Sequence, residues 1–205
     1  MEIGKLAEKI VEKRRAAVAS YALLTGISGI DASGKGHVTT KLAERISNHN
    51  VVVINVDGWL NLPNVRFDPL RPAENFYENA LRLDEMFESL ISPLKKTRRV
   101  DIAMDYTDET ATEYRTHRYK SDDVDVILLE GIFLFKRRFV DHFDLKLWVD
   151  CSFETALERA IDRGQEGLAK EETIRAYETI YFPAQRIHLK RDNPKAVADL
   201  TFDND

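Results

Sequence analysis

Short apolar runs alternate along the chain with stretches in which apolar residues recur every three or four positions. Several of these runs are β-branched and nearly continuous, which is typical of strands covered on both faces. The sequence therefore predicts five buried strands, at residues 21–27, 51–56, 124–129, 145–149 and 198–202.

Helical periodicity fills the segments between the runs. Ser152 stands where a helix N-cap is expected, directly before an apolar stripe. Pro93 marks the expected end of a long helix, and Pro183 is expected to kink or break the last helix. The predicted helices are one within residues 1–19, one carrying Val38, Leu42 and Ile46, one over 76–90, one over 153–161 and one over about 170–190.

Strands that alternate with helices form right-handed crossovers and a mostly parallel sheet. We therefore expect an α/β fold with about five parallel strands and helices on both faces of the sheet. Ligands of such sheets bind at the carboxyl ends of the strands. The places to search for a site are directly after Ile27, Val56, Leu129 and Val149.

Length and charge narrow the classes of protein. A chain of 205 residues fits one domain over residues 1–205, and a formal net charge of -5 argues against nucleic acid or an anionic membrane as partner. No apolar stretch approaches the roughly 20 residues of a membrane span, and the Glu-rich start lacks the apolar centre of a signal peptide. We expect a soluble, cytoplasmic protein. The exposed face of the first helix is compatible with homo-oligomer formation, and a solvated face is the simpler interpretation.

Cys151 is the only cysteine, so no intramolecular disulfide can form. Its place at the end of a predicted strand favours an inert, buried thiol.

A phosphate-binding motif follows the first strand, and its sequence matches G-x-x-x-x-G-K from Gly29 to Lys35. Glycines let the backbone curl so that successive N–H groups converge on phosphate oxygens, and the following helix adds its N-terminal dipole. Lys35 adds a full positive charge near the β- and γ-phosphates. The nucleotide-binding residues predicted here are Gly29, Asp31, Ala32, Ser33, Gly34, Lys35, Gly36 and His37.

Gly36 departs from the common motif, in which a Ser or Thr hydroxyl after the lysine ligates magnesium. Adenylate kinases are similar in carrying glycine at this place, so kinase activity is compatible with the change. Thr39 and Thr40 are poor substitutes because they lie further along the helix. His37 is compatible either with a phosphate contact or with an exposed helix start.

Asp57 ends the second predicted strand, beside the phosphate loop. A carboxylate there is well placed to accept the proton of an acceptor hydroxyl and to help organise magnesium; an N-cap or loop aspartate is the alternative. The connection that follows is long and irregular, which is often a sign of function. In it, Asp68 could bind substrate hydroxyls, Arg66 could meet phosphate, and Trp59 or Phe67 could cover a ring.

Five segments, in this order, resemble the uridine kinase and phosphoribulokinase family: GISGIDASGKG, VINVDGW, FDP, VDVILLEGIFLF and LKLWVDCSFETALERAIDRG. The similarity extends from about Leu23 to Phe202. It implies a P-loop kinase fold, which is a three-layer sandwich with a small lid, here a short one at about 164–172.

The resemblance also implies roles for single residues. Asp57 would be the catalytic base and Asp68 would bind sugar hydroxyls. Glu130 would lie beside magnesium and the phosphates. Arg163 would stabilise charge on the moving phosphoryl group at the base of the lid, and Arg159 is equally compatible with that role and with a solvated helix face.

Two departures from the family pattern concern the acceptor. Uridine kinases typically have Asp-Ser-Phe-Tyr after the second strand, whereas Asp57-Gly58-Trp59 is closer to kinases that resemble pantothenate kinase. The segment that contacts the base is only loosely matched near Tyr106. Candidate acceptor contacts in this region are Tyr106, Tyr114, Arg115 and His117.

These observations predict ATP- and Mg²⁺-dependent phosphorylation of a hydroxyl, foremost the 5′-hydroxyl of a pyrimidine nucleoside such as uridine or cytidine. Alternatives are another small alcohol, pantothenate-like or sugar, and a nucleoside monophosphate, for which Arg66, Arg71 and Arg115 could supply a basic site. From a different class, a nucleotide-binding regulatory protein without catalysis would account for the missing Ser or Thr.

Overall fold

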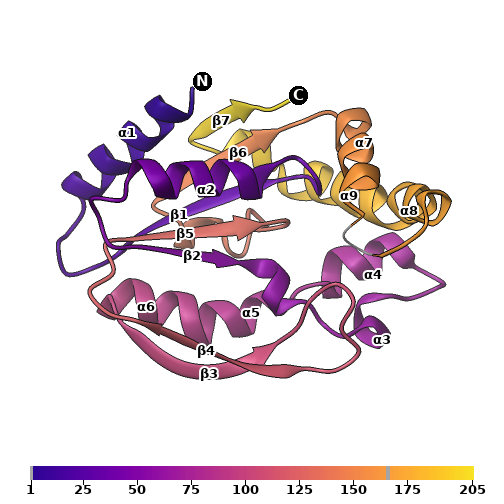
Figure 1. Ribbon diagram of the computed structural model, residues 1–205, viewed down its shortest axis with the longest axis horizontal. Coiled ribbons are helices and arrows are strands. Elements are labelled where there is room, and N and C mark those ends of the chain that lie inside the picture. Colours follow the sequence, from indigo (N-terminus) through magenta and orange to yellow (C-terminus); the bar gives the residue numbers. More distant parts are fainter. Residues whose placement is uncertain (1, 165–166) are drawn as a thin grey trace.

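The computed structural model describes residues 2–164 and 167–205 and confirms the predicted α/β architecture. One sheet contains five parallel strands in the order β2-β5-β1-β6-β7, with helices on both faces (Figure 1). Each predicted apolar run overlaps one strand of this sheet. The strands are β1 (Leu23–Gly29), β2 (Val51–Asn55), β5 (Val126–Gly131), β6 (Leu145–Asp150) and β7 (Leu200–Asp203).

Consecutive residues of the central strands face two separate hydrophobic cores. Leu23 belongs to the core beneath α1 (Ile3–Ala16) and α2 (Lys35–Arg45). Leu24 and Ile127 belong to the larger core on the opposite face of the sheet. Both faces of each strand are thus buried, which explains why the strand sequences are apolar without alternation.

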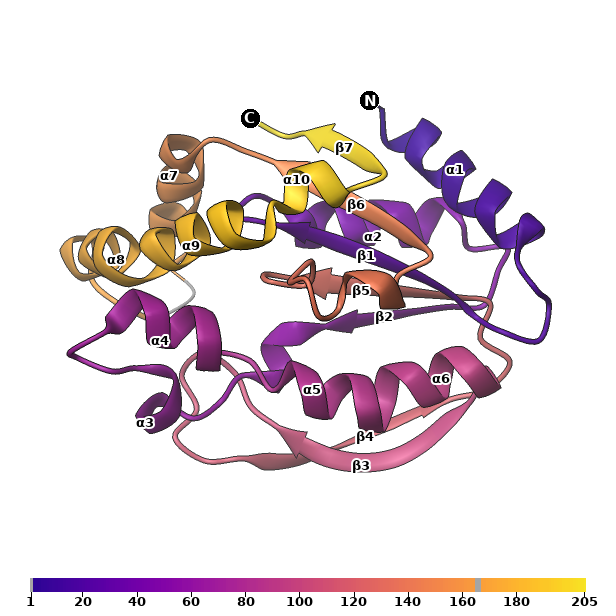
Figure 2. The same ribbon diagram turned by 180° about the vertical axis from the view of Figure 1, so that it is seen from behind.

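The long helix predicted over 76–90 is two separate helical units, so that prediction was wrong. The chain leaves the helix at residues 80–82, where Arg82 donates its backbone N–H to the carbonyl of Trp59 at 2.9 Å and Leu81 pairs with Leu60. Tertiary pairing therefore overrides the helical period at this point. Figure 2 shows the two units apart, and their parts are α4 (Pro72–Asn79), α5 (Leu83–Met86), a π-helical segment (Phe87–Ile91) and α6 (Ser92–Thr97).

Both prolines predicted to end or disturb a helix follow a π-helical turn and lie near the start of the next α-helical segment. A missing N–H is tolerated there, so the helix containing Pro93 continues to Thr97. Pro183 lies just after the π-helical segment Tyr177–Tyr181. The last helix is therefore irregular before Pro183, as expected, but it is not broken there. The helices around this π-helical segment are α8 (Lys170–Ala176) and α9 (Phe182–Asp192), and short helices α3 (Pro63–Arg66) and α10 (Pro194–Val197) lie elsewhere.

The N-cap prediction at Ser152 is confirmed, since its hydroxyl accepts a hydrogen bond from the backbone N–H of Thr155 at 3.1 Å, at the start of α7 (Phe153–Arg163). The lid expected at about 164–172 contains residues 165 and 166, which lie outside the described residues. None of the described helices combines the length and apolarity needed to cross a bilayer.

An antiparallel hairpin outside the main sheet was not predicted. It consists of β3 (Val100–Tyr106) and β4 (Arg115–Ser121), and the second strand reads RTHRYKS, which has no apolar run to identify it. Its Tyr119 ring stacks on Trp59 with ring centroids 5.9 Å apart. The hairpin therefore covers the segment that follows β2.

Candidate active site

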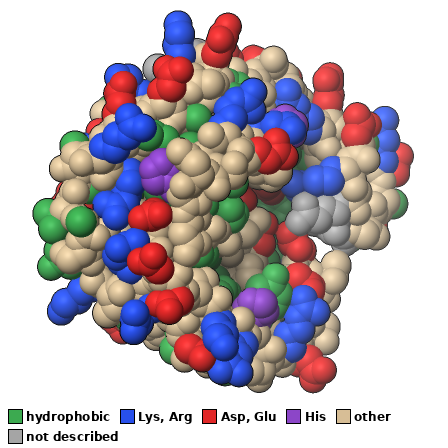
Figure 3. Space-filling model, turned by 60° about the vertical axis from the view of Figure 1, so that its left-hand side comes forward, with side chains coloured by type: hydrophobic (Ala, Val, Ile, Leu, Met, Phe, Trp, Pro, Cys, Tyr) green, Lys and Arg blue, Asp and Glu red, His purple; other side chains and the backbone are tan. Residues whose placement is uncertain are grey.

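A cavity of about 530 Å³ opens at the carboxyl ends of the parallel strands, where the sequence placed the site. Figure 3 shows the molecule hollowed between acidic and hydrophobic side chains. The lining residues fall into a phosphate-loop group, a carboxylate group and a mainly aromatic group. They are Asp31, Ala32, Gly34, Lys35, Gly36, His37, Asn55, Asp57, Leu60, Arg66, Phe67, Phe76, Glu109, Glu130, Ile132, Arg163, Leu168 and Tyr181.

The phosphate loop joins β1 to α2, as predicted. Ala32 and Gly34 have φ angles of 56° and 83°, so the backbone turns through the left-handed region twice before the helix. Such turns aim successive N–H groups at one point and form an anion-binding concavity. Asn204 fixes the loop from outside by donating to the carbonyl of Ser33 at 2.7 Å.

Lys35 is buried at the cavity wall, and its Nζ donates to the carbonyl of Ile30 at 3.2 Å. The hydroxyls of Thr39 and Thr40 donate to the helix carbonyls of Lys35 and Gly36, at 2.8 and 3.0 Å. Neither threonine therefore replaces the hydroxyl missing at Gly36. His37 lines the cavity from an exposed position.

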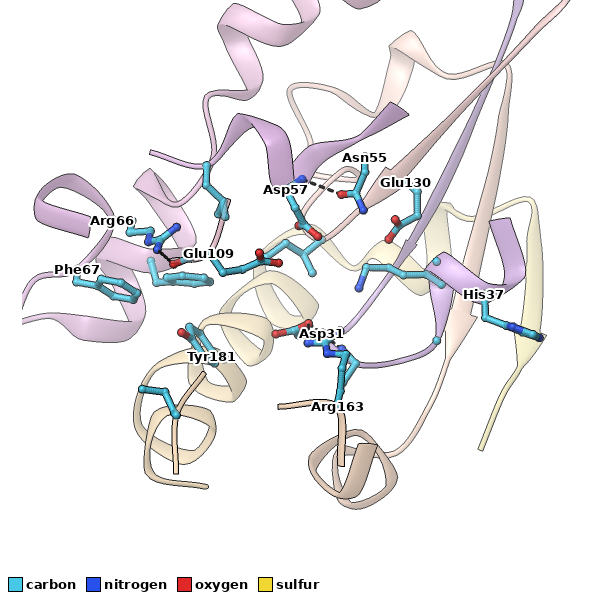
Figure 4. A pocket seen from close by; sticks show the side chains of 18 residues that line it. Asp31, His37, Asn55, Asp57, Arg66, Phe67, Glu109, Glu130, Arg163 and Tyr181 are labelled. Carbon is cyan, nitrogen blue, oxygen red and sulfur yellow. Dashed lines mark hydrogen bonds and ion pairs between the residues drawn. The ribbon is translucent and has the colours of Figure 1, made fainter. Parts of the chain in front are cut away.

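Asp57 and Glu130 come from the ends of neighbouring strands β2 and β5 and both line the cavity (Figure 4). The amide side chain of Asn55 accepts the backbone N–H of Asp57 at 2.7 Å and fixes the turn on which the carboxylate sits. Burial raises the pKa of Asp57 to about 6, and the charge of Lys35 opposes the rise. Burial likewise raises the pKa of Glu130 to about 7. Two poorly solvated carboxylates thus lie beside a buried ammonium group.

Asp31 connects the phosphate loop to two later helices. Its Oδ2 accepts a hydrogen bond from the hydroxyl of Tyr177 at 2.9 Å, and its Oδ1 lies 3.8 Å from a guanidinium nitrogen of Arg163. Arg163 lines the cavity. Arg159 does not, and it donates instead to the carbonyl of Asn204 at 2.8 Å.

The far end of the cavity is aromatic with one buried cation. The Arg66 side chain is buried and donates to the backbone carbonyl of Glu109. Phe67 stacks on Phe76 with centroids 5.9 Å apart, and Tyr181 lies 4.9 Å from Phe76. Sequence reasoning missed Asn55, Glu109 and Tyr181 as lining residues. Asn55 ends β2 two residues before Asp57, whereas Glu109 and Tyr181 come from segments that only folding brings to the cavity.

Trp59 was predicted to cover a substrate ring, and the structure contradicts this. The side chain is fully buried between Tyr119 and the guanidinium of Arg82, so it offers no surface to a ligand. The hairpin, absent from the prediction, covers it.

Other predicted acceptor contacts lie outside the cavity lining. Tyr106 and His117 pack on each other in the hairpin with centroids 5.0 Å apart. Asp68 accepts the backbone N–H of Leu70 at 2.8 Å in a local turn, and its sugar-binding role stays a prediction. Tyr114 donates to Asn61 at 3.2 Å, and Arg115 forms an ion pair with Asp108 at 3.2 Å.

Comparison with known proteins agrees with this geometry. The model of the phosphoribulokinase / uridine kinase family matches residues 24–181. A uridine kinase of Lactococcus lactis is 31% identical over 150 residues, which are 70% of this chain and 69% of that protein. A uridine kinase of Saccharomyces cerevisiae is 30% identical over 145 residues, 68% of this chain, and the matched part is only 28% of the yeast protein.

A solved structure described as a possible uridine kinase from Bacillus stearothermophilus superimposes with a TM-score of 0.75. The superposition covers 98% of this chain and 97% of that one at 20% identity. At this identity the match demonstrates a shared fold.

Proposed function

The chain belongs to the phosphoribulokinase and uridine kinase family, and from this premise we propose that it transfers the γ-phosphate of ATP to a hydroxyl group of a small molecule. One observation carries the proposal: Lys35, Asp57 and Glu130 come from three separate segments and line one cavity beside a phosphate loop. Two buried carboxylates with raised pKa values in one cavity are typical of a functional site.

The residues present fit ATP and magnesium. Loop N–H groups and Lys35 would hold the β- and γ-phosphates. Magnesium takes one or two carboxylates together with phosphate oxygens and water. Glu130 would supply one, and Asp57 beside it would help organise the ion. When bound, the ion neutralises charge on the phosphates.

Asp57 is the group we assign as general base. A base works best when its pKa lies near the working pH, and burial brings this carboxyl to about 6. The side chain would orient the acceptor hydroxyl and take its proton as the oxygen attacks phosphorus. Arg163, beside the phosphate loop, would stabilise the charge of the moving phosphoryl group and help exclude water.

The first acceptor to test is the 5′-hydroxyl of uridine or cytidine, because the relatives reported above are named uridine kinases. Other small alcohols remain candidates, since the hairpin residues predicted to read a base lie outside the cavity.

An acceptor panel tests the proposal. The protein is incubated with ATP and Mg²⁺ and with nucleosides, nucleoside monophosphates, sugars and pantothenate, and phosphorylated product is identified by mass spectrometry. Product with at least one hydroxyl acceptor is expected, and Lys35→Met should abolish it. Nucleotide binding without product from any acceptor would favour the regulatory protein instead.

A further inference from the structure

A buried positive charge at the acceptor end of the cavity lacks an anionic partner. Arg66 is 4% exposed, and the one hydrogen bond that its side chain forms with a described residue goes to the neutral backbone carbonyl of Glu109. Among the described residues, its Nε has no hydrogen-bond partner and no carboxylate forms an ion pair with the guanidinium. The carboxylates of Glu109 and Asp108 act on it only at longer range.

Such an arrangement is costly for the free protein. A guanidinium removed from water loses several kcal/mol of solvation unless an anion pairs with it, and burial accordingly lowers the pKa of Arg66. A neutral hydrogen-bond donor would be enough to bind the Glu109 carbonyl, so this bond does not explain why a charged side chain is buried here. The charge itself is explained if a ligand brings the missing anion.

The place of Arg66 in the cavity indicates which ligand this would be. In the view of Figure 4, Arg66 lies at the opposite end of the cavity from Glu130, with Glu109 and Asp57 between them. ATP phosphates at Lys35 would therefore be distant from an anion at Arg66, which limits their repulsion. An acceptor spanning this length would present its hydroxyl to Asp57.

We infer that the acceptor is a hydroxyl compound with an anionic group, a carboxylate or a phosphate monoester, which Arg66 binds. Phe67 and Phe76 form apolar walls beside Arg66 and would pack on the carbon skeleton between the two ends. The reaction is unchanged: the acceptor oxygen forms a bond to the γ-phosphorus, the bond to ADP breaks, and the hydroxyl proton goes to Asp57. This inference rests on the proposed kinase activity and replaces a neutral nucleoside by an anionic acceptor.

Paired acceptors that differ in one anionic group test the inference. The pairs are glycerol and glycerate, pantothenol and pantothenate, and ribose and ribose 5-phosphate, with uridine as an additional neutral acceptor. The anionic members should have kcat/KM values at least tenfold higher, and the pair with the largest preference distinguishes carboxylate from phosphate. Equal or better use of uridine or of the neutral members would overturn the inference.

Variants link the preference to Arg66. Arg66→Met should raise KM for the anionic acceptor by about 10- to 100-fold, the range for a lost charge-assisted hydrogen bond, with little change in KM for ATP. Arg66→Lys should lie between Met and wild type. Arg99→Met removes an exposed arginine outside the cavity lining and serves as the matched control. An anionic preference that survives in Arg66→Met contradicts the assignment.

A binding experiment tests the anion site at Arg66 even when no acceptor in the panel is phosphorylated. The protein is saturated with a nonhydrolysable ATP analogue and Mg²⁺, and malonate or inorganic phosphate is added in a thermal-shift titration. One of the anions should stabilise wild type and Arg99→Met but not Arg66→Met. Absence of stabilisation, or an equal shift in all three proteins, would overturn the inference. Because this measurement needs no turnover, it separates a failed anion site from a failed kinase proposal.

Discussion

The hydroxyl of Tyr177 donates a hydrogen bond of 2.9 Å to Oδ2 of Asp31, which joins a late helix to the phosphate loop. Asp31 also accepts the backbone N–H of Ala32 at 2.8 Å, the residue that adopts a positive φ in the loop. The fully buried ring of Tyr177 therefore supports the loop conformation from the π-helical segment Tyr177–Tyr181.

Tyr177→Phe removes this hydrogen bond and the 3.5 Å one that Arg163 donates to the same hydroxyl, and it keeps the ring. We expect the free energy of unfolding to fall by about 0.5–1.5 kcal/mol and KM for ATP to rise, with KM for the acceptor little changed. Denaturant titration and initial-rate kinetics measure the two effects. Tyr21→Phe, at an exposed tyrosine, is the control, and an unchanged KM for ATP in Tyr177→Phe would argue against support of the loop.

Asp57→Asn keeps the size of the side chain and removes the proposed base. Turnover should fall by roughly 10²–10⁴-fold, the usual effect of a positioned base, while ATP binding persists. Asp105→Asn makes the same chemical change on the exposed hairpin and should leave turnover intact. Near wild-type turnover in Asp57→Asn would refute the assignment.

The pH dependence of kcat/KM provides an independent measurement of the same carboxyl. A base acts only when deprotonated, and the pKa of Asp57 is raised to about 6. Activity of the free enzyme should therefore decrease below pH 6 and level off above pH 7. A profile that stays flat from pH 5 to pH 8 would assign the proton transfer elsewhere.

Local signals in the sequence were sufficient for the central sheet and the phosphate loop. Continuous apolar runs identified the five parallel strands, and one motif with its flanking strand and helix placed Lys35 at their carboxyl edge. Asp57 was found because it directly follows a buried strand, and Glu130 was found through the resemblance of its LLEGI segment to the family.

Long-range contacts account for what the sequence did not reveal. β4 is rich in charged residues and pairs only with β3, so no apolar pattern in the sequence predicts this strand. The burial of Trp59 depends on β4, because Tyr119 of this strand stacks on the Trp59 ring. Glu109 and Tyr181 reach the cavity from segments far apart in the chain. Arg66 was recognised as a candidate cation, but its burial without an anion is a property of the folded packing.

Glu130→Gln should stabilise the protein in neutral and alkaline solution. The pKa of the folded carboxyl is about 7, whereas the ordinary pKa of a glutamate is 4.5, so the folded state binds more protons than the unfolded state between these pH values. The free energy of unfolding therefore falls as pH rises through this window, and the neutral amide avoids the loss. We expect a gain on the order of 1–3 kcal/mol at pH 8 that disappears near pH 4.

Denaturant titrations at several pH values measure this gain, with the exposed Glu88→Gln as control. Phosphoryl transfer by Glu130→Gln should at the same time be impaired, because a proposed magnesium ligand is lost. If Glu130→Gln and wild type were equally stable at pH 8, the carboxyl of Glu130 would not be desolvated in the folded protein.

Gly58→Ala tests the close contact between the segment after β2 and the hairpin. A Cβ at Gly58 would overlap the ring of Tyr106, and Thr107 donates its backbone N–H to the carbonyl of Gly58 at 3.1 Å, so the hairpin has little freedom to retreat. Overpacking of this kind costs about 1–3 kcal/mol, and turnover should fall as well because Asp57 is the preceding residue. Gly4→Ala places the same methyl group on α1 with no atom within 4 Å and should leave stability unchanged or raise it by up to about 1 kcal/mol. Equal stability of the two variants in urea would show that the hairpin moves aside. If Gly58→Ala also retained turnover, the position of Asp57 would not depend on the position of the hairpin.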